Sequence, residues 1–168
     1  MSSRPPEADD RAAPGRWEGG LVIGGGLEGR LAVLVERATR LAALASRLGM
    51  RPAGLVAREL AGMARDIPDA LVRAIAWDQG MGMARRADFT EATGVKACSC
   101  DSRSPWQRGT SESANGLIRD CFPKGTGFSK ATDGEVRGMR GQLNGRPRQT
   151  LGWKRPADAY AGLSGKAA

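Results

Sequence analysis

The sequence contains no histidine and only three cysteines among its 168 residues, Cys98, Cys100 and Cys121. Histidine and closely spaced cysteine pairs are the usual zinc ligands, and Cys98 and Cys100 do not have the spacing of a CxxC motif. Three cysteines also leave any disulfide framework incomplete. These absences argue against a structural zinc site and favour free thiols in a reducing cytoplasm.

Long apolar runs are missing as well. No stretch reaches the roughly 18 apolar residues that a membrane-spanning helix needs, and the N-terminus lacks the charged-then-apolar pattern of a signal peptide. We therefore expect a soluble, cytoplasmic protein with no membrane partner. Residues 1–14 are polar and contain three prolines, which predicts a disordered lead-in.

The charge of the chain is the first positive signal. It carries 26 Lys and Arg residues against 18 Asp and Glu, a formal net charge of +8. Most of the excess lies between positions 98 and 156, where 11 basic residues face 5 acidic ones. This balance favours a polyanionic partner such as nucleic acid, although basic proteins without such a partner can show it too.

The order of the apolar patterns predicts an α/β protein. Three strand-like runs come first and suggest an antiparallel meander, at 17–23, 31–36 and 40–46. The alanines of the third run leave a helix open as the alternative there. A helix, a strand, a second helix and a short strand then follow, at 50–67, 71–77, 84–93 and 95–100, with later helices at 132–143 and 156–160. A strand, a helix and a strand in this order indicate a crossover onto the same sheet.

The glycine-rich turn at 24–29 formally matches G-x-G-x-x-G, a signature of dinucleotide binding. That motif requires a helix to begin at the turn, and the run that follows at 31–36 is of β type instead. We therefore reject a nucleotide-binding interpretation of this turn.

Positions 104–119 combine a loop with a helix that carries chemically useful side chains. Thr110 or Ser111 is expected to cap this helix by accepting a hydrogen bond from a free backbone N–H. Three positions then share one helical face, because they recur at i, i+3/i+4 and i+7. They are the carboxylate of Glu112, the amide of Asn115 or else Gly116, and the guanidinium of Arg119. Such a face suits a metal ion with a phosphate beside it. The alternative is an ordinary solvated helix face.

Asp78 stands where the strand-like run at 71–77 ends. A sheet opens to solvent at the ends of its strands, so a carboxylate there is well placed for chemistry. The alternative is a turn or helix-capping aspartate, because Gln79 and Gly80 follow it.

The run 104–125, SPWQRGTSESANGLIRDCFPKG, resembles the third acidic motif of bacterial transposases of the insertion-sequence-thirty family. The likeness covers nearly all of 15–160, in segments that include WEG at 17–19, VLVER at 33–37, WDQG at 77–80, LNGRPR at 143–148, TLGWK at 150–154 and PADAY at 156–160. It implies an α/β, ribonuclease-H-like catalytic core of the integrase type, with a mixed sheet flanked by helices. The order of predicted elements agrees with that fold. The implied divisions are a lead-in at 1–14, the core at 15–125 and a helical, basic tail at 126–168, continuous with the core.

The resemblance also implies a chemistry, namely transposition by metal-dependent cleavage and transfer of DNA strands. Two magnesium ions about 3.5–4 Å apart can perform it, and these hard cations prefer carboxylate oxygens. The transposases use two aspartates and a glutamate. Asp78 and Glu112 match the second and third of these and are separated by 33 residues, so they are the expected catalytic residues and ligands of Mg²⁺ or Mn²⁺.

The chain departs from the family pattern at the first aspartate, where it has Gly20. Glu18 points to the same strand face but lies roughly 6.5–7 Å along the strand, which makes it a poor substitute. Two further departures are Gly82, where relatives usually have glutamate, and 102–103, where they have proline and histidine. The chain also has no room for the helix-turn-helix that usually precedes the core. We therefore expect a shortened, degenerate copy that binds metal weakly, if at all, and is catalytically dead or nearly so.

Basic residues are better preserved than the carboxylates. Their expected partner is DNA, both the transposon ends and the target. A homo-oligomer is possible as well. The alternative for each arginine is a solvated surface charge. Trp106 or Trp153 could pack against DNA or a partner chain, with core packing as the alternative. The residues expected to contact phosphates are Arg108, Arg119, Lys124, Arg146, Arg148 and Lys154, together with Arg155. Two other interpretations remain open: a non-catalytic DNA-binding remnant, and a basic nucleic-acid-binding protein that never had an active site.

Overall fold

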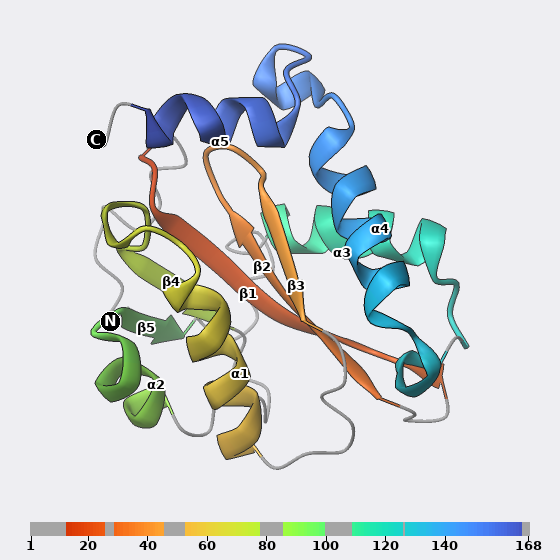
Figure 1. Ribbon diagram of the computed structural model, residues 1–168, viewed down its shortest axis with the longest axis horizontal. Helices are drawn as coiled ribbons and strands as arrows, with labels where there is room; N and C mark the ends of the chain where they lie inside the picture. The colour runs from red at the N-terminus through yellow and green to blue at the C-terminus, as the bar shows by residue number, and fades with distance from the viewer. Residues whose placement is uncertain are drawn as a thin grey trace.

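The computed structural model describes residues 13–25, 29–45, 53–77, 86–99, 109–125 and 127–165. They form a five-stranded mixed sheet with helices on both faces (Figure 1). The strands are β1 (Arg16–Ile23), β2 (Arg30–Glu36), β3 (Ala42–Ala45), β4 (Ala74–Trp77) and β5 (Lys96–Ser99), in the spatial order β3-β2-β1-β4-β5.

The first three strands form the antiparallel meander that the sequence predicts, since β1 pairs with β2 and β2 with β3. The run predicted at 40–46 therefore contains a strand, Ala42–Ala45, where a helix was the alternative, and residue 46 lies outside the described residues. β4 returns parallel to β1, and β5 lies parallel to β4. The predicted crossover onto the same sheet is thus confirmed.

Two apolar clusters lie on opposite faces of the sheet. The helices are α1 (Ala53–Arg65), α2 (Arg86–Thr93), α3 (Gly109–Cys121), α4 (Asp133–Gly145) and α5 (Pro156–Ser164). On one face α1 and α2 pack over a cluster that includes Trp17, Leu60 and Phe89. On the other face α3 and α4 cover a second cluster, which includes Ile118 and Met139. Figure 1 shows α3 and α4 together, apart from α1 and α2.

Helix α4 is tied to the free edge of the sheet. A capping box is present at its start, where Thr132 accepts from the Glu135 N–H and Glu135 accepts from the Thr132 N–H. Near its end, the Asn144 side chain accepts from the Ala42 N–H at 2.8 Å and donates to the Ala42 carbonyl at 2.9 Å. The edge strand β3 therefore has a local partner, which limits pairing with another chain.

Successive side chains of β1 alternate between the two faces. Trp17 packs in the α1 cluster, whereas Val22 packs in the α3 cluster. Gly19 faces Trp77 across the neighbouring strand, and a Cβ built on it would lie 1.8 Å from the Trp77 ring. Gly20, one residue on, faces the opposite side. Among the described residues, the Asn115 Nδ2 is the atom nearest to a Cβ built there, at 4.0 Å.

These two adjacent glycines should respond differently to the same change. Gly19→Ala is expected to lower the free energy of unfolding by about 1–3 kcal/mol or more, because Trp77 must leave its position. Gly20→Ala should leave the free energy of unfolding unchanged or raise it by up to about 1 kcal/mol. No atom of the described residues lies closer than 4.0 Å to the added Cβ, and the unfolded chain loses entropy. Urea-induced unfolding of both variants measures the difference. Equal losses of stability would contradict this packing.

Three sequence predictions need correction. The strand predicted at 71–77 covers only Ala74–Trp77, because 69–71 forms a 3₁₀ turn and the Leu71 carbonyl accepts from the Trp17 Nε1 at 2.8 Å. The helical turn predicted at 156–160 extends to Ser164, with Pro156 in its first turn. The third correction concerns the cap of α3 and follows with the site.

Some predictions fall on other parts of the chain. Of the lead-in predicted at 1–14, residues 1–12 lie outside the described residues. Cys98 and Cys121 are free thiols, and Cys100 lies outside the described residues. No helix in the described part of the chain is long and apolar enough to cross a membrane.

Candidate functional site

The candidate site lies where β1 passes under α3, at the point along the strand where its pairing with β4 ends. The parallel pairing of β1 with β4 ends at Gly19 and Trp77, so Gly20 is the next residue on β1. Asp78 follows Trp77 in the sequence but lies outside the described residues, and so do Gly82 and positions 102–103. The predicted role of Asp78 therefore stays a prediction.

Gly20 is buried beneath α3. A side chain at this position would point toward Asn115, since the Asn115 Nδ2 is the nearest atom to an added Cβ, at 4.0 Å. Its φ is not in the left-handed region, so the backbone would accept an ordinary residue. The position that the family resemblance assigns to an aspartate thus faces the helix that carries Glu112, and no described atom lies closer than 4.0 Å to an added Cβ.

Glu112 lies in the first turn of α3 and is exposed to solvent. Asn115 is half-buried one turn later, and Arg119 is half-buried in the last turn. Because residues three or four apart on a helix share a face, these side chains follow one side of α3. The chain therefore brings Gly20 and Glu112 to the same region of the molecule, as neighbours of the same asparagine.

Glu18 is fully buried and already has two partners. Its Oε1 lies 3.0 Å from the Arg37 Nε, and both side chains are almost inaccessible to solvent. Its Oε2 accepts a hydrogen bond from the Ser111 N–H at 2.9 Å. A carboxylate engaged in this way is not a free metal ligand, which supports its description as a poor substitute for the missing aspartate.

The Glu18 contact also corrects the predicted cap of α3. The helix begins at Gly109, so Thr110 and Ser111 lie inside its first turn and neither is the capping residue. The free N–H of Ser111 is satisfied by Glu18 from β1, and the Thr110 hydroxyl accepts from Arg40 Nη1. A buried carboxylate also stabilises the positive end of the helix dipole. Nothing in the local sequence signals this partner, because 93 residues separate it from Ser111.

The carboxylates of the described residues do not suffice for a two-metal site. In that part of the chain no group of three or more His, Cys, Asp or Glu side chains could hold a metal ion. Of the three acidic positions that the resemblance assigns, position 20 offers no side-chain oxygen and Glu112 offers one carboxylate. Among the described residues the donor set is therefore incomplete for two magnesium ions, and Asp78 lies outside them.

The basic residues predicted to contact DNA have different surroundings. Arg119 donates to the Ile23 carbonyl at 2.6 Å, and its guanidinium lies 5.8 Å from the centre of the Phe128 ring. Arg148 is half-buried and donates to the Leu143 carbonyl at 3.0 Å. The remaining ones that the structure describes are exposed: Lys124, Arg146, Lys154 and Arg155. Arg108 and Trp106 lie outside the described residues.

Trp153 is 70% exposed, so it is not a core residue. It has a positive φ of 66° and follows Gly152, whose φ is 60°. The loop that carries it is closed by two backbone hydrogen bonds, from the Arg148 N–H to the Lys154 carbonyl at 3.1 Å and from the Trp153 N–H to the Arg148 carbonyl at 2.9 Å. The structure thus presents one large aromatic side chain to solvent between exposed basic residues.

No family model matches the chain. Among curated proteins, it is 43% identical over 161 residues to the transposase for insertion sequence element IS1086 of Cupriavidus metallidurans, which covers 94% of this chain and 46% of that protein. It is 42% identical over 150 residues to transposase InsI for insertion sequence element IS30A of Escherichia coli, covering 89% and 39% of the two chains. The transposase for IS4351 of Bacteroides fragilis is 28% identical over 160 residues, covering 95% and 48%.

The resemblance stated from the motifs is therefore confirmed. The chain is homologous to insertion-sequence-thirty transposases over nearly all of its own length, and it spans about half or less of the length of the relatives it matches.

Solved structures show the fold. The catalytic core domain of BIV integrase superposes with a TM-score of 0.70 at 16% identity, covering 92% of this chain and 99% of that one. A chain of the simian T-cell lymphotropic virus intasome, in complex with PP2A regulatory subunit B56 gamma, gives a TM-score of 0.60 at 15% identity, covering 79% and 49%. The predicted ribonuclease-H-like, integrase-type core is confirmed.

Proposed function

We propose that this homologue of insertion-sequence-thirty transposases is a degenerate form of their catalytic core, and that its inherited function is DNA transposition. That function comprises DNA binding, phosphodiester cleavage and strand transfer. In this copy the two chemical steps are lost or nearly lost, because Gly20 provides no carboxylate. The observation that carries the proposal is that position 20, where the family resemblance expects an aspartate, is a glycine on the β1 face toward the helix that bears Glu112. The core is assigned to 15–125 and the basic tail to 126–168.

Asp78 and Glu112 are the proposed remaining ligands of a divalent cation, Mg²⁺ or Mn²⁺. Two carboxylates hold a hard cation more weakly than three, because each contributes oxygen ligands and negative charge. Glu18 does not replace the missing one, since its two oxygens contact Arg37 and Ser111. Metal-dependent activity of the chain is accordingly expected to be very low.

DNA is the proposed partner, bound through exposed basic residues of the C-terminal part. Lys124, Arg146 and Lys154 are free to approach phosphates, since all three are exposed. Arg119 has a positioning role in addition, because it fixes the end of β1 to α3 through the Ile23 carbonyl. Such contacts give salt-dependent affinity without reading sequence.

A salt titration tests this interface. The double variant Arg146→Gln/Lys154→Gln should reduce the slope of log affinity against log salt by about two, because each lost phosphate contact removes roughly 0.9. Binding of a duplex oligonucleotide is measured by fluorescence anisotropy at several salt concentrations. The matched control is Arg58→Gln/Lys96→Gln, which removes the same charges from exposed positions on α1 and β5. Equal slopes in the two double variants would contradict the proposed interface.

A second candidate is a remnant that binds DNA without cutting it. The engagement of Glu18 and the loss of a side chain at Gly20 favour it. Glu112→Ala separates the two candidates, since it should abolish the residual metal-dependent activity of a degenerate transposase core, whereas a remnant has no activity to lose. DNA affinity is kept in both cases. A basic protein that never had an active site is disfavoured by the similarity to transposases over 94% of the chain.

A further inference from the structure

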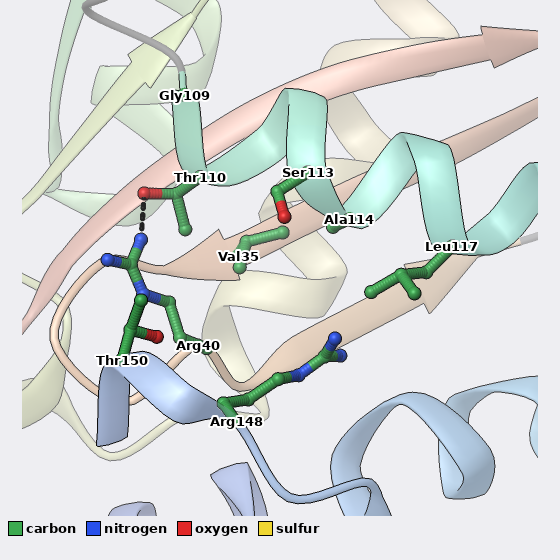
Figure 2. A pocket seen from close by; sticks show the side chains of 9 residues that line it. All are labelled: Val35, Arg40, Gly109, Thr110, Ser113, Ala114, Leu117, Arg148 and Thr150. Carbon is green, nitrogen blue, oxygen red and sulfur yellow. Dashed lines mark hydrogen bonds between the residues drawn. The ribbon is translucent and has the colours of Figure 1, made fainter. Parts of the chain in front are cut away.

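A pocket lies on the side of α3 away from Glu112. It has a volume of about 240 Å³ and lies between α3, β2 and the segment that leads into the 3₁₀ turn at Gln149–Leu151. Figure 2 shows Thr110, Ser113 and Leu117 lining it from α3, with Arg40 and Arg148 approaching from the opposite side. These α3 residues recur at helical spacing, so they form a face distinct from that of Glu112.

The pocket is positively charged. Two arginines line it, and none of the lining residues that the structure describes is acidic. Burial, together with the charges of Arg146 and Arg40, lowers the pKa of the Arg148 guanidinium, which nevertheless stays protonated at neutral pH. The first turn of α3 also lies at its edge, where the helix dipole favours negative charge.

Both arginines are held in place by protein contacts. Arg40 Nη1 donates to the Thr110 hydroxyl, and the Arg40 backbone adopts a left-handed conformation with φ of 63° in the turn before β3. Arg148 Nη2 donates to the Leu143 carbonyl at 3.0 Å. The Arg148 Nε, by contrast, is buried with no hydrogen-bond acceptor among the described residues. A buried charged donor without an acceptor is costly, so an anion in the pocket would stabilise it.

We propose that this pocket binds a phosphate group, held by the Arg40 and Arg148 guanidinium groups and by the hydroxyl of Ser113. The volume of about 240 Å³ accommodates such a group with several waters, since one water in the liquid occupies about 30 Å³. Guanidinium groups match phosphate oxygens in geometry and charge. The phosphate belongs either to a DNA backbone or to a free phosphate ion. The site is separate from the metal site, because it uses the other face of α3.

Inorganic phosphate is the probe, titrated into the full chain at constant ionic strength and followed by amide chemical shifts. Saturable shifts are expected at Thr110, Ser113 and Leu117. Ser113→Glu, which places a negative charge at an exposed lining position, and Arg148→Gln should each weaken binding about tenfold or more, because a hydrogen bond between charged groups is lost or opposed. The matched control Arg140→Gln removes an exposed charge of α4 outside the pocket and should bind as the parent does.

A second arm identifies the source of the phosphate. If a short DNA duplex displaces inorganic phosphate from these residues, the pocket takes a DNA backbone phosphate; if phosphate binds and the duplex does not displace it, the pocket takes the free ion. Either result supports the proposal. Shifts that do not saturate, that lie elsewhere, or that are equal in Ser113→Glu and the parent would overturn it. Ser113→Glu keeps this test informative if Arg148→Gln unfolds the chain.

Discussion

Gly20→Asp is expected to raise metal-dependent strand cleavage and transfer by about two orders of magnitude or more. A correctly bound metal ion stabilises the transition state by several kcal/mol, and each 1.4 kcal/mol or so changes a rate tenfold. Among the described residues, the atom nearest to an added Cβ is the Asn115 Nδ2, at 4.0 Å, so none of them obstructs the start of the new side chain. It would also face the helix that carries Glu112. The measurement is the rate of nicking and strand transfer on DNA with Mg²⁺ or Mn²⁺, compared with the unchanged chain.

Two controls separate charge from shape in this experiment. Gly20→Asn occupies the same volume as aspartate without its negative charge, so it should stay as inactive as the parent. The double variant Gly20→Asp/Glu112→Gln should lose the gain, if Glu112 is a ligand as proposed. If Gly20→Asp and the parent had the same rate, whether high or low, the absence of a carboxylate at position 20 would not be the main cause of lost activity.

The largest expected effect on stability is at Glu18. Glu18→Ala should lower the free energy of unfolding by about 3–5 kcal/mol, because the buried Arg37 guanidinium loses the carboxylate that pairs with it. Arg37 is 3% exposed and Glu18 is inaccessible, so water cannot take over this role. The change also leaves the Ser111 N–H without its acceptor. Since a typical domain has about 5–15 kcal/mol of total stability, much of it would be lost.

Urea-induced unfolding measures this loss, with Glu112→Ala as the matched control. Glu112 is an exposed carboxylate of α3, and its removal should change stability by no more than about 0.5 kcal/mol. A double variant Glu18→Gln/Arg37→Met should recover part of the loss, because no charge is then left buried alone. If Glu18→Ala and Glu112→Ala were equally stable, Glu18 would not anchor α3 as described.

The sequence predicts the elements with strong local patterns. The apolar, β-branched run of 31–36 and the alternating run of 17–23 appear as strands, and the stripe of 50–67 contains α1. The helix predicted at 132–143 appears as α4, Asp133–Gly145. Local chemistry decides each of these elements, so little knowledge of the rest of the fold is needed.

What the sequence does not predict are contacts between distant segments. The close approach of Trp77 to Gly19 shows why a glycine is required there, but only once the two strands are paired. The same holds for the first turn of α3, because the Ser111 N–H donates to Glu18 of β1, which is 93 positions away in the sequence. β4 begins at Ala74 and not at Leu71 for a similar reason, because the Leu71 carbonyl accepts a hydrogen bond from Trp17 of β1.

The candidate site was partly within reach of the sequence. Helical spacing alone places Asn115 and Arg119 on the face of Glu112, and the family motifs identify Gly20 as a departure. The engagement of Glu18 and the pocket between Arg40 and Arg148 have no local signal, because their residues come from segments up to about a hundred positions apart. Only the folded chain reveals them.

The affinity of the full chain for Mn²⁺, measured by calorimetry for the parent, Gly20→Asp and Gly20→Asn, tests the central claim most directly. The added carboxylate of Gly20→Asp should tighten binding about tenfold or more, since ligand number and charge set the affinity for a hard cation. The parent and Gly20→Asn should bind weakly and alike. Equal affinity in the parent and Gly20→Asp, or an equal gain in Gly20→Asn, would contradict the conclusion that a missing carboxylate at position 20 disables this site.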